Sequence, residues 1–243
     1  MISDPISIFR NMPAMETSRL FLRQMSVDDS ADMYAYASDP RVSEYLLWGP
    51  HKSQDYTRSY IAFLQKAYRK GEFYDWAVVE KESGRMIGTG GFSKIDAKND
   101  LVEIGYVLSA AHWGKGYGSE IAAFLLRFGF EVLQCQRIEA RYMVENGASR
   151  RVMEKCGMLF EGVHRKCLLV KGVYRDIGIC SILREEYEKD DEKRNEYAGT
   201  NDCLQLHGGE KTPLAVLEST AKAPEKSPLC AHWYDRLRKN HGG

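Results

Sequence analysis

The sequence from residue 102 to residue 132 reads VEIGYVLSAAHWGKGYGSEIAAFLLRFGFEV, which places an apolar segment, a glycine-rich turn and an amphipathic segment in direct succession. The apolar part ends at Leu108 and is typical of a buried strand. Glycines follow at Gly114, Gly116 and Gly118, and apolar residues at helical spacing begin immediately after them. Glycines allow the backbone to approach a ligand closely, and the first N–H groups of a helix attract negative charge. The sequence therefore predicts an anion-binding turn that suits a pyrophosphate.

Lys115 and Ser119 lie in the same turn and add a cationic side chain and a hydroxyl donor. The turn is not a Walker phosphate loop, because no Gly-Lys-Ser or Gly-Lys-Thr follows a four-residue gap after a glycine. It also fits a dinucleotide-binding fingerprint poorly, since that motif follows the first strand of a βαβ unit and this turn comes late in the chain. Three glycines at a turn can also be purely structural. The surrounding sequence must therefore decide between these readings.

Around this turn, the hydrophobic patterns predict a series of strands and helices. We expect helices over residues 26–38, 53–70, 116–133 and 148–155, and strands over residues 74–80, 86–92, 102–108, 137–144 and 159–183. Ser26 with Asp29 resembles a capping box, and Gly71 stands at a C-cap position. Lys171-Gly172 turns the last strand into a hairpin. This order of elements predicts a mixed sheet with helices on its faces, in the α/β or α+β class.

Regular patterning ends near residue 188 of the 243-residue chain. We therefore expect an N-terminal extension over residues 1–15, one folded domain over residues 16–188, and a polar extension over residues 189–243 that is weakly ordered or peripherally docked. The chain is 44% hydrophobic and 28% charged, as in soluble globular proteins, and no apolar run is long enough to span a membrane. The N-terminus has no signal-peptide pattern, which predicts a cytoplasmic location.

Charge and cysteine content argue against several classes of partner. Lysine and arginine together number 34, as do aspartate and glutamate, so no overall field attracts nucleic acid or an anionic membrane. The six cysteines are widely spaced, without a C-x-x-C pair or a histidine at metal-ligand spacing. We therefore expect reduced thiols and no metal site. An anionic ligand must be held by a local arrangement of residues.

The glycine-rich turn resembles the cofactor motif of the GNAT superfamily of N-acetyltransferases, which reads Arg/Gln-x-x-Gly-x-Gly/Ala at the start of the helix after the fourth strand. Gly116 and Gly118 match its glycines, and Trp113 stands in the Arg/Gln position, as is common in the RimJ/RimL-type branch of ribosomal-protein N-acetyltransferases. Further stretches similar to that branch follow its order: Glu16-Thr17-Ser18-Arg19-Leu20, Val102-Glu103-Ile104-Gly105-Tyr106, Glu145-Asn146 with residues 149–158, and Gly172-Val173-Tyr174-Arg175-Asp176. The resemblance extends over residues 16–187 and is more specific than one glycine loop.

The resemblance implies a fold and a cofactor. The fold is a mixed, mostly antiparallel sheet of about seven strands with a splay between the fourth and fifth strands and helices on both faces. Acetyl-CoA is the implied cosubstrate, and its pantetheine would pair with the fourth strand like an added strand. The implied cofactor-binding residues are Tyr106, Val107, Leu108, Trp113, Gly114, Lys115, Gly116, Tyr117, Gly118, Ser119, Asn146 and Arg151. Asn146 is equally well placed to cap the helix that follows it.

By the same resemblance, acetyl transfer is direct and needs a base for the amine and an acid for the departing thiolate. Glu103 on the fourth strand is the expected base, although a salt-bridged strand residue would look the same. Met153 replaces the tyrosine that serves as acid in many members, so Ser149 or a water is the expected acid; Ser149 could instead satisfy the helix N-terminus. The expected substrate-binding residues are Tyr45, Trp48 and Tyr174.

These features predict an N-acetyltransferase that moves acetyl from acetyl-CoA to a primary amine, with a protein N-terminal α-amino group as the expected acceptor. Two alternatives remain open. The acceptor could be a small-molecule amine, such as a polyamine, an amino acid or an antibiotic, or the chain could be a non-catalytic CoA-binding GNAT module. We expect a monomer or homodimer that binds no nucleic acid, membrane or metal.

Overall fold

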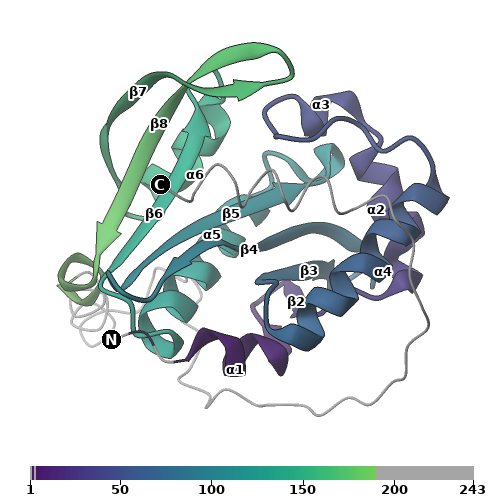
Figure 1. Ribbon diagram of the computed structural model, residues 1–243, viewed down its shortest axis with the longest axis horizontal. Coiled ribbons are helices and arrows are strands. Elements are labelled where there is room, and N and C mark those ends of the chain that lie inside the picture. The colour runs from purple at the N-terminus through teal and green to yellow at the C-terminus, as the bar shows by residue number, and fades with distance from the viewer. Residues whose placement is uncertain (1, 3, 190–243) are drawn as a thin grey trace, which may run out of the picture.

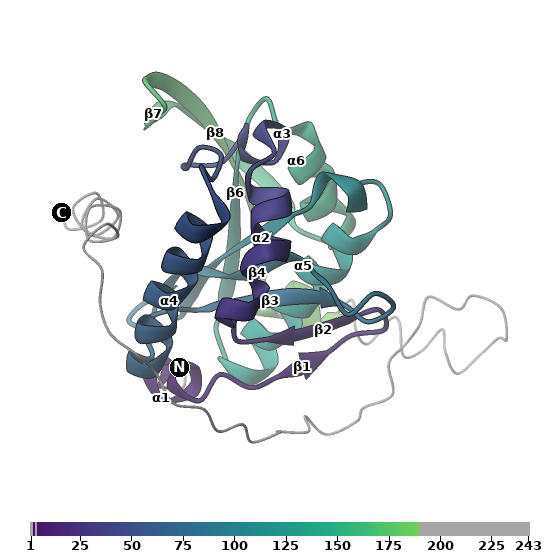
Figure 2. The same ribbon diagram turned by 90° about the vertical axis from the view of Figure 1, so that its right-hand side faces the viewer.

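The structure is a computed structural model that describes residue 2 and residues 4–189. Apart from Lys189, the C-terminal extension expected over residues 189–243 lies outside the described residues. The described residues form one sheet with helices on both faces, as Figure 1 and the turned view in Figure 2 show. The fold class is the mixed α/β arrangement that the sequence predicts.

The sheet has eight strands in the order β1-β2-β3-β4-β5-β6-β8-β7. Their bounds are β1 Met15–Glu16, β2 Leu20–Arg23, β3 Asp75–Glu80, β4 Met86–Asp96, β5 Leu101–Leu108, β6 Arg137–Met143, β7 Leu159–Val170 and β8 Val173–Leu183. Neighbouring strands are antiparallel except β5 and β6, which run parallel. The short hairpin of β1 and β2 brings the sheet to eight strands, beside the about seven that the family resemblance implies.

The four predicted helices occur in the predicted order, with two differences at their ends, and the short helices α1 and α3 are additional to the prediction. Their bounds are α1 Pro5–Arg10, α2 Ser30–Ala37, α3 Pro40–Ser43, α4 Gln54–Lys70, α5 Tyr117–Arg127 and α6 Gly147–Lys155, with short turns at η1 Val27–Asp29, η2 Ala110–His112 and η3 Phe128–Val132. The helix expected over residues 26–38 begins as the 3-10 turn η1. The helix expected over residues 116–133 continues beyond α5 as the π-helical turn η3, where Gly129 packs against Ile138.

Neighbouring glycines of β4 distinguish the two faces of the sheet. A Cβ added at Gly90 would lie 2.6 Å from a methyl carbon of Ile121, so α5 packs directly on that face. A Cβ added at Gly91 would lie 2.2 Å from Oδ1 of Asp75 on the opposite face, because successive residues of a strand point to opposite sides. Helices α2 and α4 lie on this second side (Figure 2).

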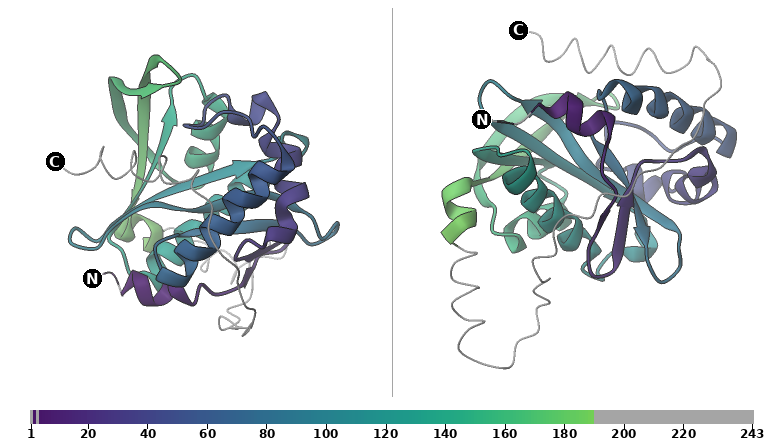
Figure 3. Two further views of the ribbon diagram at one scale, coloured as in Figure 1. Left: turned by 45° about the vertical axis from the view of Figure 1, so that its right-hand side comes forward. Right: turned by 90° about the horizontal axis from the view of Figure 1, so that it is seen from below.

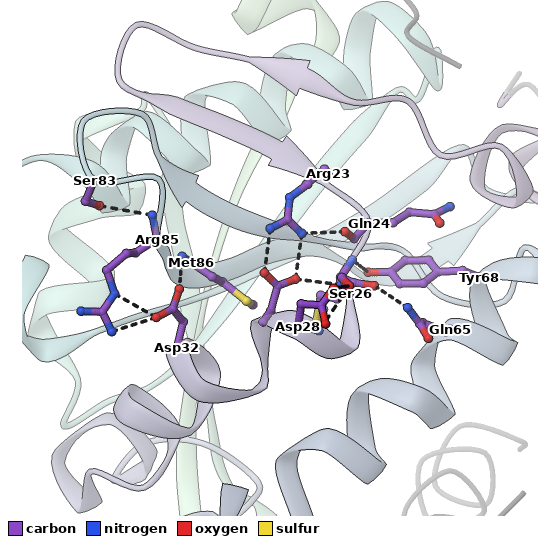
Figure 4. A network of polar contacts seen from close by, with 12 residues as sticks. Arg23, Gln24, Ser26, Asp28, Asp32, Gln65, Tyr68, Ser83, Arg85 and Met86 are labelled. Carbon is purple, nitrogen blue, oxygen red and sulfur yellow. Dashed lines mark hydrogen bonds and ion pairs between the residues drawn. The ribbon is translucent and has the colours of Figure 1, made fainter. Parts of the chain in front are cut away.

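Polar contacts fix the start of α2 to the sheet, as Figure 4 shows. Ser26 and Asp29 form the predicted capping box, and Arg23 of β2 donates to both carboxyl oxygens of Asp29 at 2.7 Å. Asp32 accepts a hydrogen bond from Arg85 at 2.9 Å. Asp29 is only 6% exposed, so the guanidinium of Arg23 supplies hydrogen bonds that water cannot.

Helix α4 begins and ends where the sequence predicts. Ser53 caps its N-terminus, and Gly71 ends it in the left-handed conformation with φ 70°. Tyr68 lies near its C-terminus with 1% of its surface exposed and donates its hydroxyl hydrogen to the carbonyl oxygen of Asp75 at 2.5 Å. The helix is therefore tied to the first residue of β3.

Phe9 of α1 is fully buried, although the sequence predicts only an extension there. Its ring centroid lies between 4.7 and 6.0 Å from those of Tyr74, Trp76, Phe92 and Phe128. A single aromatic residue in a six-residue helix leaves no periodic pattern, which is why the sequence does not reveal this packing. Part of the predicted extension thus belongs to the core.

We expect Phe9→Ala to lower the free energy of unfolding by about 3–5 kcal/mol, because it opens a cavity among four aromatic rings. Ile6→Ala is the matched control, since Ile6 lies on the same helix but is 47% exposed, and it should change stability by about 0.5 kcal/mol or less. Urea unfolding followed by tryptophan fluorescence measures both variants. Equal effects would contradict the packing of α1 in the core.

Candidate active site

The two parallel strands of the sheet separate along half their length. Pairing between β5 and β6 runs from Leu101 and Arg137 to Ile104 and Ala140 and stops there, although both strands continue. On its other side, β5 stays paired with β4 as far as Leu108. The backbone groups of β5 beyond Ile104 that face β6 therefore have no strand partner. This is the splay that the family resemblance implies.

A loop rich in backbone donors lies at the end of β5. Gly114 and Gly116 have φ 73° and 83°, a conformation that glycine adopts without strain. Glu120 donates the first bond of α5, to the carbonyl of Gly116 at 3.1 Å. Residues 113–116 form a turn, and among the described residues the amides from Gly114 to Ser119 donate no backbone hydrogen bond within 3.5 Å. Several N–H groups at a helix N-terminus are therefore available to an anion, and residues 114–116 are exposed.

Side chains hold this loop from outside without filling it. Trp113 donates its Nε1 hydrogen to the carbonyl of Leu108 at 2.8 Å and is 48% exposed. Tyr117 turns its side chain away from solvent and donates its hydroxyl hydrogen to Glu80 at 2.6 Å. Tyr117 can therefore offer its backbone N–H to a ligand, whereas its hydroxyl is already bonded to Glu80.

Arg19 is a residue of this region that the sequence analysis does not single out. Its guanidinium donates to the carbonyl of Lys115 at 2.9 Å, stacks 4.2 Å over the ring of Tyr117 and pairs with Glu120 at 2.7 Å. Although burial opposes ionisation, hydrogen bonds from Thr17 and Arg19 lower the pKa of Glu120. The residues that Arg19 contacts are about 100 positions away, so no local pattern reveals its role. Its one sequence signal is that it belongs to the first stretch similar to the family.

Gly118 lets α6 pack against the start of α5. A Cβ added there would lie 3.3 Å from a methyl carbon of Val152, so a larger side chain would push the two helices apart. Tyr106 lies on the same side of the sheet and donates its hydroxyl hydrogen to the carbonyl of Ser149 at 3.5 Å. Burial raises the pKa of Tyr106 to about 12. The structure thus brings Tyr106 and Ser149 together beside the splay.

The residues predicted on α6 have different surroundings. Asn146 accepts a hydrogen bond from the backbone N–H of Ser149 at 3.2 Å, so its side-chain oxygen caps the helix. Arg151 is exposed, and Met153, which replaces the family's tyrosine, is 3% exposed and packs in the core. The cap explains why asparagine suits this position even without a ligand.

Glu103 lies on the opposite face of β5, and both of its carboxyl oxygens have partners. Ser93 donates to Oε1 at 2.7 Å, and Arg141 of β6 pairs with Oε2 at 2.9 Å. Arg141 also approaches Glu139 at 3.6 Å. The carboxylate thus bridges β4 and β6 at the level where the splay begins, and these contacts are the salt-bridged arrangement that the sequence could not exclude.

The expected substrate-binding residues lie around one end of the sheet. Tyr45 packs beside Met143, Val170 and Ile177, and Trp48 lies 5.4 Å from the ring of His51. Tyr174 on β8 is 62% exposed.

Lys171, at the tip of the β7–β8 hairpin, donates from Nζ to the carbonyl of Ser43 at 2.5 Å. This contact joins the hairpin to α3, which lies at the same end of the molecule (Figures 1 and 3). The two flanks of the splay are therefore connected by a hydrogen bond.

Two other kinds of site are absent from the described residues. Residues 4–189 contain no group of three or more His, Cys, Asp or Glu side chains that could hold a metal ion. Within the same range, no helix has the length and apolar character to cross a bilayer.

A splayed sheet with a helix N-terminus at its open edge defines a transferase that holds an acyl carrier beside the sheet. Residues 19–159 match the family model described as the acetyltransferase (GNAT) domain. The chain therefore belongs to the GNAT family of N-acetyltransferases, whose members use acetyl-CoA.

Several relatives are similar to this chain. An N-acetyltransferase called p20 from Bacillus licheniformis is 35% identical over 176 residues, which are 72% of this chain and 99% of the relative. The crystal structure of a GNAT-family acetyltransferase from Bacillus anthracis is 30% identical with a TM-score of 0.63, and the match covers 71% of this chain and 99% of that one. The putative ribosomal N-acetyltransferase YdaF of Bacillus subtilis (strain 168) is 33% identical over 105 residues, which are 43% of this chain and 57% of the relative.

We expect Gly116→Asp to raise the dissociation constant for acetyl-CoA at least tenfold, which is about 1.4 kcal/mol, because it places a carboxylate against the exposed amides. Gly84→Asp is the matched control, since Gly84 also has positive φ, 66°, and open surroundings but lies in the turn between β3 and β4. Isothermal titration calorimetry measures both affinities. An unchanged affinity in Gly116→Asp would refute the anion-binding role of the loop.

Proposed function

We propose that the protein transfers the acetyl group of acetyl-CoA directly to a primary amine and that the acceptor is a protein N-terminal α-amino group. The observation that carries the proposal is the pair of features at the end of β5: unbonded amides from Gly114 to Ser119 and an unpaired strand edge beyond Ile104. The first suits a pyrophosphate, and the second suits the amides of a pantetheine chain.

The residues present fit this cosubstrate. Backbone groups of Tyr106, Val107 and Leu108 would pair with the pantetheine, because this edge of β5 has no partner strand. Gly114, Lys115, Gly116, Tyr117, Gly118 and Ser119 would hold the pyrophosphate through their amides. Trp113, Asn146 and Arg151 flank these groups; the amide nitrogen of Asn146 is still available, because its oxygen is the atom that caps α6. When bound, the cosubstrate supplies an activated thioester.

We assign Glu103 as the base that takes a proton from the attacking amine. It lies at the start of the splay, and Arg141 and Ser93 fix the position of its two oxygens. These contacts fix the orientation of the carboxylate, and a water can connect it to a nitrogen at the strand edge. Glu103 would accept the proton that the nitrogen loses once its bond to the acetyl carbon forms.

On the side of the departing sulfur, Ser149 and Tyr106 supply hydroxyl groups. Ser149 lies in the first turn of α6, and Tyr106 donates its hydroxyl hydrogen to the carbonyl of the same residue. We assign Ser149, or a water bound beside it, to protonate the thiolate. The phenol of Tyr106 is a second donor at this place, although burial raises its pKa to about 12.

A protein N-terminus as acceptor is supported by two observations. One relative that shares 33% identity over 105 residues carries the description of a putative ribosomal N-acetyltransferase. In addition, Tyr174 is exposed on the hairpin beside the splay and could contact the residues of a peptide that follow its reacting terminus. Tyr45 and Trp48 would line the entrance from the other side.

We expect Glu103→Gln to lower turnover by about 100-fold or more while acetyl-CoA affinity changes less than twofold, because the amide cannot accept the amine's proton. Glu139→Gln is the matched control, since Glu139 pairs with Glu103 across β5 and β6 and shares Arg141. A thiol-release assay on short peptides with free N-termini measures turnover. Normal turnover in Glu103→Gln would remove this residue from the mechanism.

The acceptor itself is tested with wild-type protein and matched compounds. We expect peptides with a free N-terminus to release CoA thiol, and the same peptides with a blocked N-terminus to give none. Turnover of polyamines or free amino acids with no turnover of peptides would contradict the proposed acceptor, and no thiol release from any amine would contradict the transferase function.

A further inference from the structure

A space free of side chains borders the splay on the face that carries α2 and α4. Gly91 of β4 pairs with Gly105 of β5, which is the first residue of β5 beyond the pairing with β6. A Cβ added at Gly105 would meet no atom within 4 Å. A small group placed over Gly105 would therefore lie directly beside the free edge of β5.

Asp75 of β3 lies next to this space. It pairs with Gly91, and its Oδ1 is 2.2 Å from the position of a Cβ added at Gly91, so the carboxyl leans over that glycine. Paired residues of neighbouring strands have Cβ positions about 5 Å apart, so a nitrogen placed between the Gly91 and Gly105 positions would lie within hydrogen-bond reach of the Asp75 carboxyl. Unlike Glu103, Asp75 has no recorded ion pair or side-chain hydrogen-bond donor among residues 4–189. Burial raises its pKa to about 7.

Tyr36 of α2 gives an independent indication of a ligand at this place. Its side chain is 4% exposed, yet its hydroxyl has no hydrogen-bond partner among the described residues. A buried hydroxyl without a partner is costly, which is why such groups usually bind a water or a ligand. Burial raises the pKa of Tyr36 well above its usual value, and Tyr60, Asp29 and Asp75 raise it further, so Asp75 lies within electrostatic range of the Tyr36 hydroxyl.

We propose that Asp75 binds the acceptor amine over Gly91 and Gly105 and takes its first proton, with the Tyr36 hydroxyl as a second polar contact. This inference rests on the proposed transferase function and assigns the residue that receives the amine. Glu103 is less suited to the first step, because Arg141 and Ser93 already engage both of its oxygens.

Acetyl transfer with Asp75 as the first base removes two protons from the amine. The amine arrives as R–NH3+, one proton passes to the Asp75 carboxylate, and the neutral R–NH2 remains. Its lone pair forms the N–C bond to the acetyl carbon, the C–S bond breaks, and the nitrogen's surplus proton passes to Glu103. Ser149 or the water beside it protonates the departing thiolate and is reprotonated from solvent as Glu103 releases its own proton. Asp75 then releases its proton to water. An α-amino group, whose ordinary pKa is about 8, matches this acceptor closely.

The first test compares Asp75→Asn with wild type in the full-length chain, using acetyl-CoA and a free N-terminal peptide. We expect kcat/KM for the peptide to fall about 100-fold or more, and the rise of kcat/KM around pH 7 to disappear. Acetyl-CoA affinity should change less than twofold. Asp96→Asn is the matched control, because it replaces a carboxyl on β4 that accepts a hydrogen bond from Asn99. It should leave kcat/KM unchanged.

A second readout needs no turnover. Because the pKa of Asp75 is raised from 3.8 to about 7, the folded protein keeps a proton that the unfolded chain loses, so ionised Asp75 destabilises the fold as pH rises. The Tm of Asp75→Asn relative to wild type should therefore increase from pH 4 to pH 7 and level off above it.

The ionisable groups that face Asp75 are Tyr36 of α2, Tyr60 and Tyr68 of α4, and Asp29 of η1 with its partner Arg23 of β2. They are present in both proteins, so their titration cancels in the difference. Burial raises the pKa values of Tyr36 and Tyr68 well above this pH range.

Gly105→Val is a second variant, which tests the proposed position of the amine rather than the carboxyl of Asp75. The Cβ of the added side chain would meet no atom within 4 Å, and we expect a stable protein with unchanged acetyl-CoA affinity and at least a tenfold lower kcat/KM for the peptide. Wild-type kcat/KM in both Asp75→Asn and Gly105→Val, or a pH-independent Tm difference, would overturn the assignment of Asp75. A wild-type protein that acetylates no amine would overturn the transferase function itself, and this inference with it.

Discussion

Parallel pairing between β5 and β6 that ends at Ile104 and Ala140 is the constraint on which the site depends. Beyond this point β6 remains paired with β8, and β5 remains paired with β4, so each strand is held by a different half of the sheet. The packing of α6 on α5, made close by Gly118, supports the separated strands from one side. The open edge is thus maintained by the rest of the fold.

The two faces of the splay supply different chemistry. On one face, Tyr106 and Ser149 place hydroxyl groups beneath the first turn of α6. On the other, Glu103 of β5 has both carboxyl oxygens engaged, and the carboxyl of Asp75 from β3 leans over Gly91 of β4. A reaction that must remove protons from a nitrogen and return one to a sulfur needs acceptors and donors on opposite sides of the reacting carbon. The alternation of side chains along β5 provides this division.

Most of the fold could be predicted because its signals are local. The capping box at Ser26, the left-handed Gly71 and the glycines of the loop each depend on neighbours in the chain, and the structure has all of them. The glycine-rich loop could be predicted from the sequence for the same reason. Phe9, Arg19 and Asp75 were missed because their importance comes from residues far away in sequence, such as Trp76, Glu120 and the open space over Gly105. No periodicity records such contacts.

The hydrogen bond from Lys171 to the carbonyl of Ser43 spans 128 residues and links the hairpin to α3. Burial lowers the pKa of Lys171, because it removes water from around the ammonium group. The hydrogen bond to the Ser43 carbonyl replaces part of this lost solvation. The bond joins a hairpin that follows β6 to a helix that precedes β3, so it connects the half of the sheet that holds β6 to the half that holds β5. A displacement of either flank of the splay would therefore be resisted by the other.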